Sequence, residues 1–133
     1  MRTFIFLLSF LVLETVQATD LYPRNESIDI RHYRFKLELN DSTNRIAGET
    51  VIDIRFKKSA TEFELDLANV NVAGLGMHVT DVIIDNLSVR FSHQNDRLKI
   101  HLRSATKPGD EKKVLVRYLG IPQDGLIIGK NKI

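Results

Sequence analysis

Apolar and polar residues alternate with a period of two over most of the chain. In the first alternating run, residues 33–39, an aromatic residue or a leucine occupies every second position and charged residues lie between them. Because successive side chains of a strand point to opposite faces, this run predicts a half-buried strand with one apolar face. Residues 40–44 are turn formers and end it. Residues 46–56 then alternate again, which predicts an antiparallel hairpin.

Shorter alternating runs follow, separated by turn residues. They predict strands over residues 62–67, 87–91, 98–102 and 114–118. The second and third of these are expected to form a hairpin around the polar residues 93–96. Pro108-Gly109 marks a tight turn, because proline presets the first central position and glycine accepts the positive φ of the second. Residues 79–84 are apolar enough for a strand buried on both sides.

These elements together predict an all-β fold. After the first eighteen residues, no window shows a convincing apolar period of 3.6 residues, so no helix is expected in the body of the chain. About seven or eight short strands, with turns at roughly ten-residue intervals, favour an antiparallel β-sandwich or layered sheet.

The first eighteen residues have the layout of a secretory signal peptide. Arg2 supplies the positive start, residues 4–13 are an apolar run, and residues 16–18 place small residues at the two positions that a signal peptidase reads. Glu14 ends the apolar run well short of the roughly 20 residues that a membrane helix needs. We therefore expect a helical signal peptide that is cleaved before Thr19, no stable membrane anchor, and a periplasmic or secreted protein.

Removal of residues 1–18 leaves residues 19–133, which are expected to form one domain. A chain of 115 residues can bury roughly two-thirds of the surface that its unfolded form exposes. Burial must supply the stability, because the chain contains no cysteine and therefore no disulfide or thiol chemistry. Without Arg2 and Glu14, the 19 basic and 17 acidic residues become 18 and 16, a net charge of +2 with both signs interspersed. The short basic clusters have no aromatic residues among them, which argues against a nucleic-acid partner.

The sequence offers few candidates for a chemical site. Its four histidines are His32, His78, His93 and His101. None has the i, i+4 partner of H-E-x-x-H, so the zinc-protease signature is absent, and no G-x-S-x-G elbow is present either. We interpret each histidine as a surface or turn residue. The sequence therefore assigns no catalytic, cofactor-binding or metal-binding residue.

Three further patterns have plain structural explanations. Residues 74–79 contain two glycines but lack the third of G-x-G-x-x-G, and no helix follows, so we expect a flexible connection. Glu62, Glu64 and Asp66 alternate with apolar residues and are expected on the solvent face of a strand. Three sites match the N-x-[ST] pattern: Asn25, Asn40 and Asn86. In a eukaryotic secretory pathway these could carry glycans, whereas in a bacterium the pattern has no meaning, and both alternatives stay open.

Several segments lie in the order found in the N-terminal β-domain of M1-family zinc aminopeptidases, the aminopeptidase N-like group. Residues 32–39 resemble its opening HYxLxL strand, and residues 47–54 resemble its FxGxVxIxI hairpin partner. Residues 65–67 are similar to its LDxxxL segment, and residues 108–120 to its PGE…LxIxYxG ending. Residues 118–132, YLGIPQDGLIIGKNK, resemble the segment that leads into the rest of the enzyme in a bacterial branch. The resemblance covers essentially the whole mature chain.

The resemblance implies a saddle-like, mostly antiparallel β-domain that packs against a thermolysin-like catalytic domain. In such enzymes two histidines and a glutamate hold a zinc ion that activates water, and G-x-M-E-N anchors the free amino group of the peptide. This chain has neither motif. Zinc and peptide substrates are therefore expected only in a catalytic domain beyond Ile133, and this chain is expected to be a C-terminally truncated, non-catalytic structural domain.

Two expectations concern the behaviour of such a domain. Built for a larger neighbour, it should expose an apolar patch when it is alone. The alternative is a free-standing, secreted β-sandwich that serves as a binding or adhesion module, since likeness of fold does not fix function.

Overall fold

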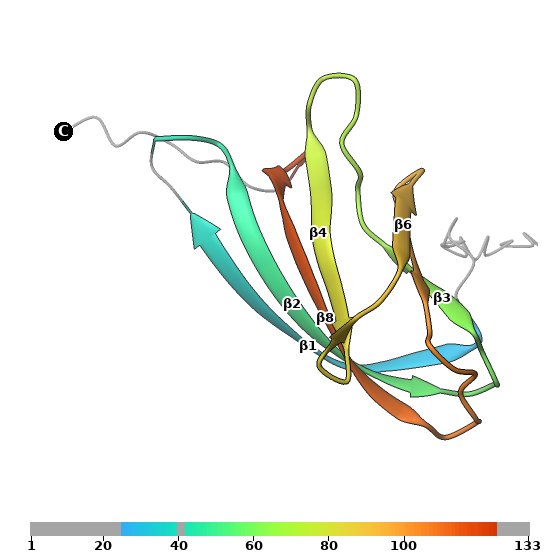
Figure 1. Cartoon of the computed structure of the whole chain (residues 1–133). Helices are drawn as coiled ribbons and strands as arrows, with labels where there is room; N and C mark the ends of the chain where they lie inside the picture. Colours follow the sequence, from blue (N-terminus) through green and yellow to red (C-terminus); the bar gives the residue numbers. More distant parts are fainter. Residues whose placement is uncertain (1–24, 40–41, 125–133) are drawn as a thin grey trace, which may run out of the picture.

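The computed structural model describes residues 25–39 and 42–124, which form two β-sheets (Figure 1). Eight strands follow one another in this part of the chain: β1 (Ile28–Leu39), β2 (Ile46–Phe56), β3 (Glu62–Asp66), β4 (Gly76–Ile84), β5 (Leu87–Ser88), β6 (Phe91–Gln94), β7 (Arg97–His101) and β8 (Glu111–Ile121). The larger sheet has the strand order β1-β2-β8-β4-β5, and the smaller has the order β3-β7-β6. All these neighbouring strands are antiparallel, so the expected all-β, antiparallel fold is confirmed.

The expected signal peptide lies outside the described residues, as do residues 40–41, the first two of the loop after β1. Within the described ranges, the chain forms no helix of the length and apolarity needed to cross a membrane.

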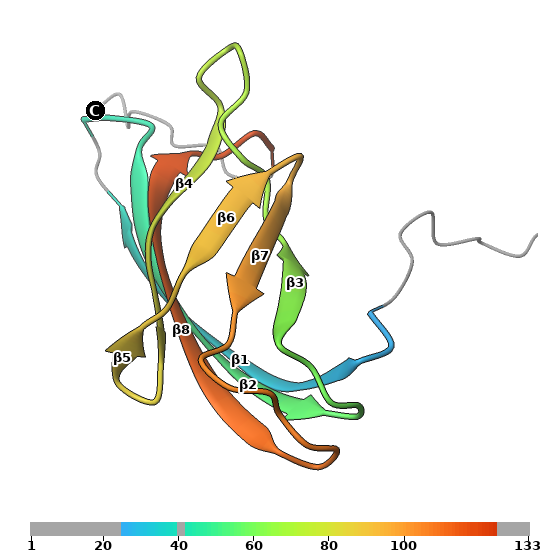
Figure 2. The same ribbon diagram turned by 45° about the vertical axis from the view of Figure 1, so that its right-hand side comes forward.

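The larger sheet is strongly curved, and the smaller sheet lies on its concave side (Figure 1 and Figure 2). Strands β1, β2 and β8 run side by side through the bend, with β2 paired to β1 on one side and to β8 on the other. The two edges of the larger sheet are β1 and β5. The result is the layered, saddle-like arrangement that was expected.

The core lies between the concave face of the larger sheet and the smaller sheet. The alternation predicted for β2 is confirmed, because Ile52, Ile54 and Phe56 are all buried. The smaller sheet supplies a matching set of buried side chains: Phe63, Leu65, Leu98 and Ile100. The rings of Phe56 and Phe63 meet edge to face, with their centroids 5.7 Å apart. Each such buried side chain is worth roughly 1.5–3 kcal/mol relative to exposure, so burial can hold this cysteine-free fold.

The chain after β4 differs from the predicted hairpin. It reverses at Asp85-Asn86, whose φ angles of 53° and 62° are those of a type I′ turn. This turn pairs β5 with β4. Only from Phe91 does the chain pair with β7, around a similar turn at Asn95-Asp96. The predicted hairpin of residues 87–91 with residues 98–102 is therefore wrong over its first residues, because the earlier turn places them in the other sheet.

The turn predicted at Pro108-Gly109 is present. Gly109 has a φ of 94°, a conformation that glycine adopts without strain. The N–H of Asp110 donates to the Lys107 carbonyl oxygen at 3.1 Å, and the Asp110 carboxylate accepts from the N–H of Lys107 at 2.8 Å. The N–H of Gly109 also donates to the Phe56 carbonyl oxygen at 2.7 Å, which ties the turn to the end of β2.

Candidate docking surface

An apolar stripe runs along β1. It consists of Tyr33, Phe35, Leu37 and Leu39, whose exposed fractions are 45, 62, 48 and 58%. We term these four residues the β1 stripe. The sequence predicted a half-buried strand with these residues on its buried, apolar face, whereas each of them is at least 45% exposed. A contiguous exposed apolar surface on a soluble domain marks an interaction site. The expectation of an apolar patch is thus met on β1.

The β1 stripe continues the core-facing side of the larger sheet. Phe35 lies opposite Thr50, and Leu37 lies opposite Gly48. Opposite residues of an antiparallel pair share a face of the sheet. Thr50 on β2 is only 5% exposed, whereas its neighbour Phe35 on β1 is 62% exposed. The concave face is therefore covered at β2 but uncovered at the adjacent strand β1. Because β1 is the edge strand of the larger sheet, its large apolar side chains lie at the surface although they are on the same face as the core.

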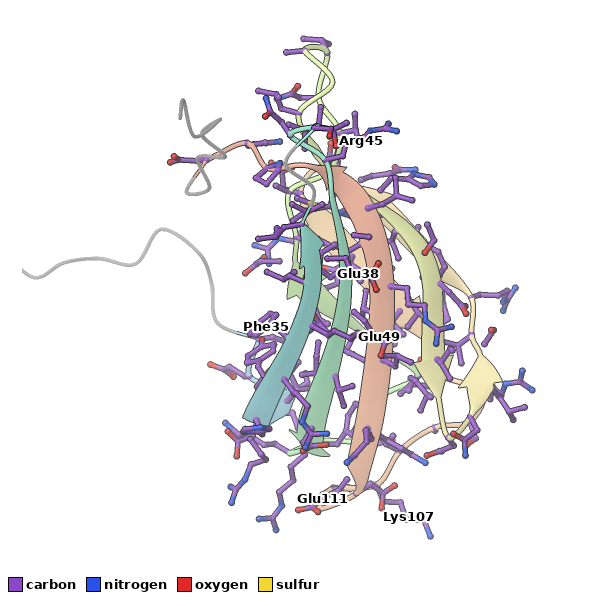
Figure 3. The ribbon with its side chains drawn as sticks, turned by 90° about the vertical axis from the view of Figure 1, so that its left-hand side faces the viewer. Phe35, Glu38, Arg45, Glu49, Lys107 and Glu111 are labelled. Carbon is purple, nitrogen blue, oxygen red and sulfur yellow. The ribbon has the colours of Figure 1, made fainter. Side chains whose placement is uncertain are left out.

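The convex face of the same sheet is charged. Figure 3 looks onto that face: Glu38 and Glu49 lie on it, whereas Phe35 projects at the free side of β1. Glu49 accepts a hydrogen bond from Arg117 at 3.0 Å, and Glu38 lies 3.9 Å from the ammonium group of Lys36. The apolar surface of β1 is therefore confined to the concave side.

An open groove of about 250 Å³ lies between β1 and the smaller sheet. One wall is formed by Tyr33 and Phe35, whose rings stack with centroids 5.6 Å apart and an interplanar angle of 13°. Residues 65–67 form the opposite wall, and Val116 and Tyr118 of β8 lie between the walls. This volume is below the roughly 300–1,000 Å³ of small-molecule pockets, so the groove suits a few side chains of a protein neighbour better than a ligand.

Gly48 makes room for Tyr118 in this groove. The two residues lie opposite each other on β2 and β8. A Cβ atom at position 48 would lie 2.3 Å from the Tyr118 ring, so glycine allows the ring to lie over β2 in its present position. The Tyr118 hydroxyl and Oγ1 of Thr50 are 3.1 Å apart and share a hydrogen bond. The buried Thr50 hydroxyl is thereby satisfied within an otherwise apolar surface.

Tyr33 is the titratable member of the β1 stripe. Partial burial raises the pKa of Tyr33, and the carboxylate of Asp66 adds to the rise. Asp66 itself forms an ion pair with Arg97 on β7. The Tyr33 phenol therefore stays neutral at physiological pH, which keeps this wall of the groove free of charge.

Two of the four histidines have specific partners. Nε2 of His93 lies 2.7 Å from the Leu67 carbonyl oxygen, and the residue belongs to β6 rather than to the turn that was predicted. Nδ1 of His101 lies 3.3 Å from the Glu62 carboxylate, so this side chain faces an acidic neighbour in its own sheet. The His93 contact joins β6 to the residue that follows β3, and the His101 contact joins β7 to β3, so both have a structural explanation.

The other two histidines, His32 and His78, are exposed on the larger sheet. Across the described ranges, no three or more His, Cys, Asp or Glu side chains are grouped so that they could hold a metal ion. The described residues therefore do not fit a zinc site.

The carboxylates of β3 face solvent, as predicted, and are paired with bases on β7. Lys99 lies 3.1 Å from Glu62 and 3.3 Å from Glu64. The hydrogen bonds to Glu62 and then Glu64 raise the pKa of Lys99. Asp66 pairs with Arg97. Each carboxylate of this row therefore has a cation on β7 beside it, which explains the row as cross-strand ion pairing and indicates no acid–base site.

The glycine-rich connection before β4 is more ordered than the expected flexible link. Oδ1 of Asn71 accepts two backbone N–H bonds within the loop, at 2.9 and 3.1 Å. Gly76 has a φ of 122°, and a Cβ atom there would lie 2.1 Å from the Asn69 carbonyl oxygen. The side-chain amide of Gln123, which follows β8, donates to the same oxygen at 3.0 Å. Gly76 therefore serves a close backbone approach, whereas Gly74 has open space around it and a φ of 77°, which favours glycine. No phosphate-binding role is indicated.

The remaining sequence features are only partly described. Asn25 and Asn86 are exposed, and Asn86 lies in the turn after β4, so both glycosylation alternatives stay open. Asn40 lies outside the described residues. Strand β8 ends at Ile121, three residues beyond the predicted strand of residues 114–118, and the part of the C-terminal stretch from residue 125 onward lies outside the described residues.

Comparison with known proteins gives matches in structure but not in sequence. The sequence matches no family model and no curated protein. The M1 zinc metallopeptidase from Deinococcus radiodurans superposes with a TM-score of 0.63 at 19% identity over 74% of this chain. A variant of that enzyme bound to a Tyr-Ser-Ala substrate gives the same values. A two-domain M1 zinc metallopeptidase bound to L-arginine gives a TM-score of 0.62 at 19% identity over 73% of this chain.

At 19% identity this likeness shows a shared fold. The chain has the fold of one part of M1 zinc metallopeptidases, and the resemblance inferred from the sequence is confirmed at that level. The matched region covers only 21% of each metallopeptidase chain, about a fifth of its length.

Proposed function

We propose that this chain is the N-terminal structural domain of an exported M1-type zinc metalloaminopeptidase and has no catalytic activity by itself. One observation supports it above the others. The described residues share their fold with about a fifth of an M1 zinc metallopeptidase, and they leave a core-type surface, the β1 stripe, uncovered. A domain that belongs to a larger enzyme exposes the face that its neighbour covers.

In this proposal the β1 stripe and its groove receive apolar side chains of the catalytic domain. Tyr33 and Phe35 are stacked on one another, so they offer aromatic surface in a fixed orientation. Aromatic residues that are already ordered make strong interface anchors, because little side-chain entropy is lost on docking. The domain would then brace the catalytic domain without contacting the reacting atoms.

Zinc and peptide substrates belong, in the same proposal, to the catalytic domain. The described histidines are exposed or engaged by Leu67 and Glu62, and they form no metal-binding group with other side chains. Zinc bound in a catalytic domain would supply the activated water and polarise the peptide carbonyl. Peptide substrates would then reach the protein only through that domain.

We also propose that residues 1–18 direct export and that the domain acts in the periplasm or outside the cell. The supporting observation is the order of a positive residue, an apolar run and small residues before Thr19. Amino-terminal sequencing of the protein recovered from the exported fraction should begin at Thr19. A chain that begins at Met1 and stays in the cytoplasm would overturn the proposal.

The absence of activity is tested with the purified chain, added zinc and aminoacyl-anilide substrates. No hydrolysis is expected. Turnover that a chelator abolishes would show that the chain is catalytic alone and would refute the proposal. A metal-free sample and a sample with the chelator added first serve as controls.

The sequence of the DNA that follows the Ile133 codon distinguishes the metallopeptidase domain from the alternative, a free-standing binding or adhesion module. A continued or shifted reading frame that encodes H-E-x-x-H supports the metallopeptidase domain. Intergenic sequence directly after the codon, with its own terminator, supports the module.

A further inference from the structure

Strand β1 has an edge that no other described strand pairs with. It is the outer strand of the larger sheet, and residues 33–39 keep a regular register with β2 on the other side. Proteins usually protect such an edge with a proline, a bulge, an inward-pointing charge or charged side chains such as lysine. Residues 33–39 have only the last of these, the charges of Arg34, Lys36 and Glu38 on the convex face. The irregularity of β1 lies earlier, between Ile30 and His32, and the side chains that point inward are the β1 stripe. This edge is therefore open to another strand.

The alternation along β1 restricts the strands that can pair there. Opposite residues of an antiparallel pair lie on the same face, so a partner covers the β1 stripe only if it places apolar residues opposite apolar residues. A second copy of β1 does so, for the pairs that fall within residues 33–39, in every register centred on a single residue. A shift by one residue would set charged side chains beside the stripe.

Charges on the convex face select one of these registers. When Leu37 lies opposite Leu37 of the second copy, each Lys36 faces Glu38 of the other copy. A centre at residue 36 or 38 instead sets a like charge against itself, and a centre at residue 35 sets Arg34 against Lys36. Like charges placed directly opposite one another are destabilising. Among centres from residue 34 to residue 38, only Leu37 brings opposite charges together without a like-charged pair.

The ion pair already present within β1 fits the same register. Lys36 and Glu38 lie 3.9 Å apart on one strand, and their side chains are 72 and 73% exposed. A second copy centred on Leu37 adds the same pair in the reverse order. Four charges of alternating sign would then cover the convex side of the contact, while the concave side is apolar.

We propose that this chain, on its own, forms a symmetric dimer in which β1 pairs antiparallel with β1 of a second copy, centred on Leu37. The two larger sheets become one continuous sheet, and the two β1 stripes form one apolar surface. The pairing does not rest on the proposed function. A catalytic domain that covers the β1 stripe would exclude the second copy, so the dimer belongs to the chain without that domain.

Charge reversal tests the pairing by sedimentation velocity over a concentration series. Lys36→Glu places two carboxylates opposite each other at both ends of the contact, and Glu38→Lys does the same with two ammonium groups. The dissociation constant of the dimer should therefore be about tenfold higher for each variant than for the parent chain. The double variant Lys36→Glu with Glu38→Lys restores opposite charges and should return the dissociation constant to near that of the parent chain. Lys107→Glu and Glu111→Lys make the same charge changes away from the free edge of β1 (Figure 3) and should have no effect.

A cysteine scan reads the register directly. The parent chain has no cysteine, so Leu37→Cys introduces a single thiol. In the proposed register the two copies of residue 37 have Cα atoms about 4.5–5.5 Å apart, within reach of a disulfide. Mild oxidation should therefore link Leu37→Cys into a covalent dimer. Phe35→Cys is the matched control, because its two thiols would be about 13 Å apart along the strands and should not link.

Three results would overturn the dimer: a parent chain that is monomeric throughout the series, single charge reversals that leave the association unchanged, or faster linking of Phe35→Cys than of Leu37→Cys. None of these results would bear on the proposed function, which is tested by peptide hydrolysis and by the downstream sequence.

Discussion

Phe35→Ala and Phe63→Ala remove the same side chain from two different environments, so their effects on stability should differ several-fold. Phe63 is 3% exposed and packs on Phe56, and its loss should lower the free energy of unfolding by about 3–5 kcal/mol. Phe35 is 62% exposed, so only about two-fifths of it leaves water on folding. Full burial of such a side chain is worth roughly 1.5–3 kcal/mol, so Phe35→Ala should lower the free energy of unfolding by about 1 kcal/mol.

Urea unfolding followed by far-ultraviolet circular dichroism measures both effects. Low protein concentration keeps self-association from adding to the stability of the parent chain. Equal slopes against urea concentration would show that both variants lose the same folded structure as the parent. An effect of Phe35→Ala as large as that of Phe63→Ala would refute the conclusion that the β1 stripe is uncovered.

Three further substitutions probe other contacts. Gly76→Ala places a Cβ atom 2.1 Å from the Asn69 carbonyl oxygen at a φ of 122°, and it should destabilise the fold by about 2 kcal/mol or more in the same urea experiment. Gly48→Ala puts a Cβ atom 2.3 Å from the Tyr118 ring, and thermal unfolding should show a Tm lower by roughly 4–8 °C or more. The pKa of Tyr33 is raised by burial and then by a nearby carboxylate, so its contribution to stability is complete below the unfolded pKa of about 10 and is lost as pH rises through the folded value. Tyr33→Phe should therefore make the loss of stability above about pH 10 shallower, as measured by unfolding at stepped pH.

Alternation was sufficient to predict strands whose two faces meet different environments. In β2, every second residue from Ile46 to Phe56 is buried, and the sequence showed that period, although Thr50 is polar and Val51 is apolar. The pattern was insufficient around β5. There the pairing depends on positive φ angles at Asp85-Asn86, which aspartate and asparagine allow but do not require. Residues 87–91 alternate whichever neighbour they pair with, so the sequence could not decide between β4 and β7.

The β1 stripe shows a second limit of sequence patterns. Phe35 and Ile52 belong to equally regular alternating runs, yet Phe35 is 62% and Ile52 only 4% exposed. The difference arises because β1 is the edge of the larger sheet while β2 lies inside it, and strand order is a property of the whole fold. The resemblance to a metallopeptidase domain was the signal that pointed to an uncovered face. Its position on β1, and the opposing charges of Lys36 and Glu38 at the edge, became clear only with the topology.

The most direct test of a domain built to support a larger metallopeptidase is the size of the native protein that carries it. An antibody against residues 25–124 should detect, in the exported fraction of the source cells, a protein several-fold larger than 115 residues. That protein should bind zinc and release amino-terminal residues from peptides. Detection of a 115-residue product alone, with no larger form and no associated peptidase, would contradict the proposed role.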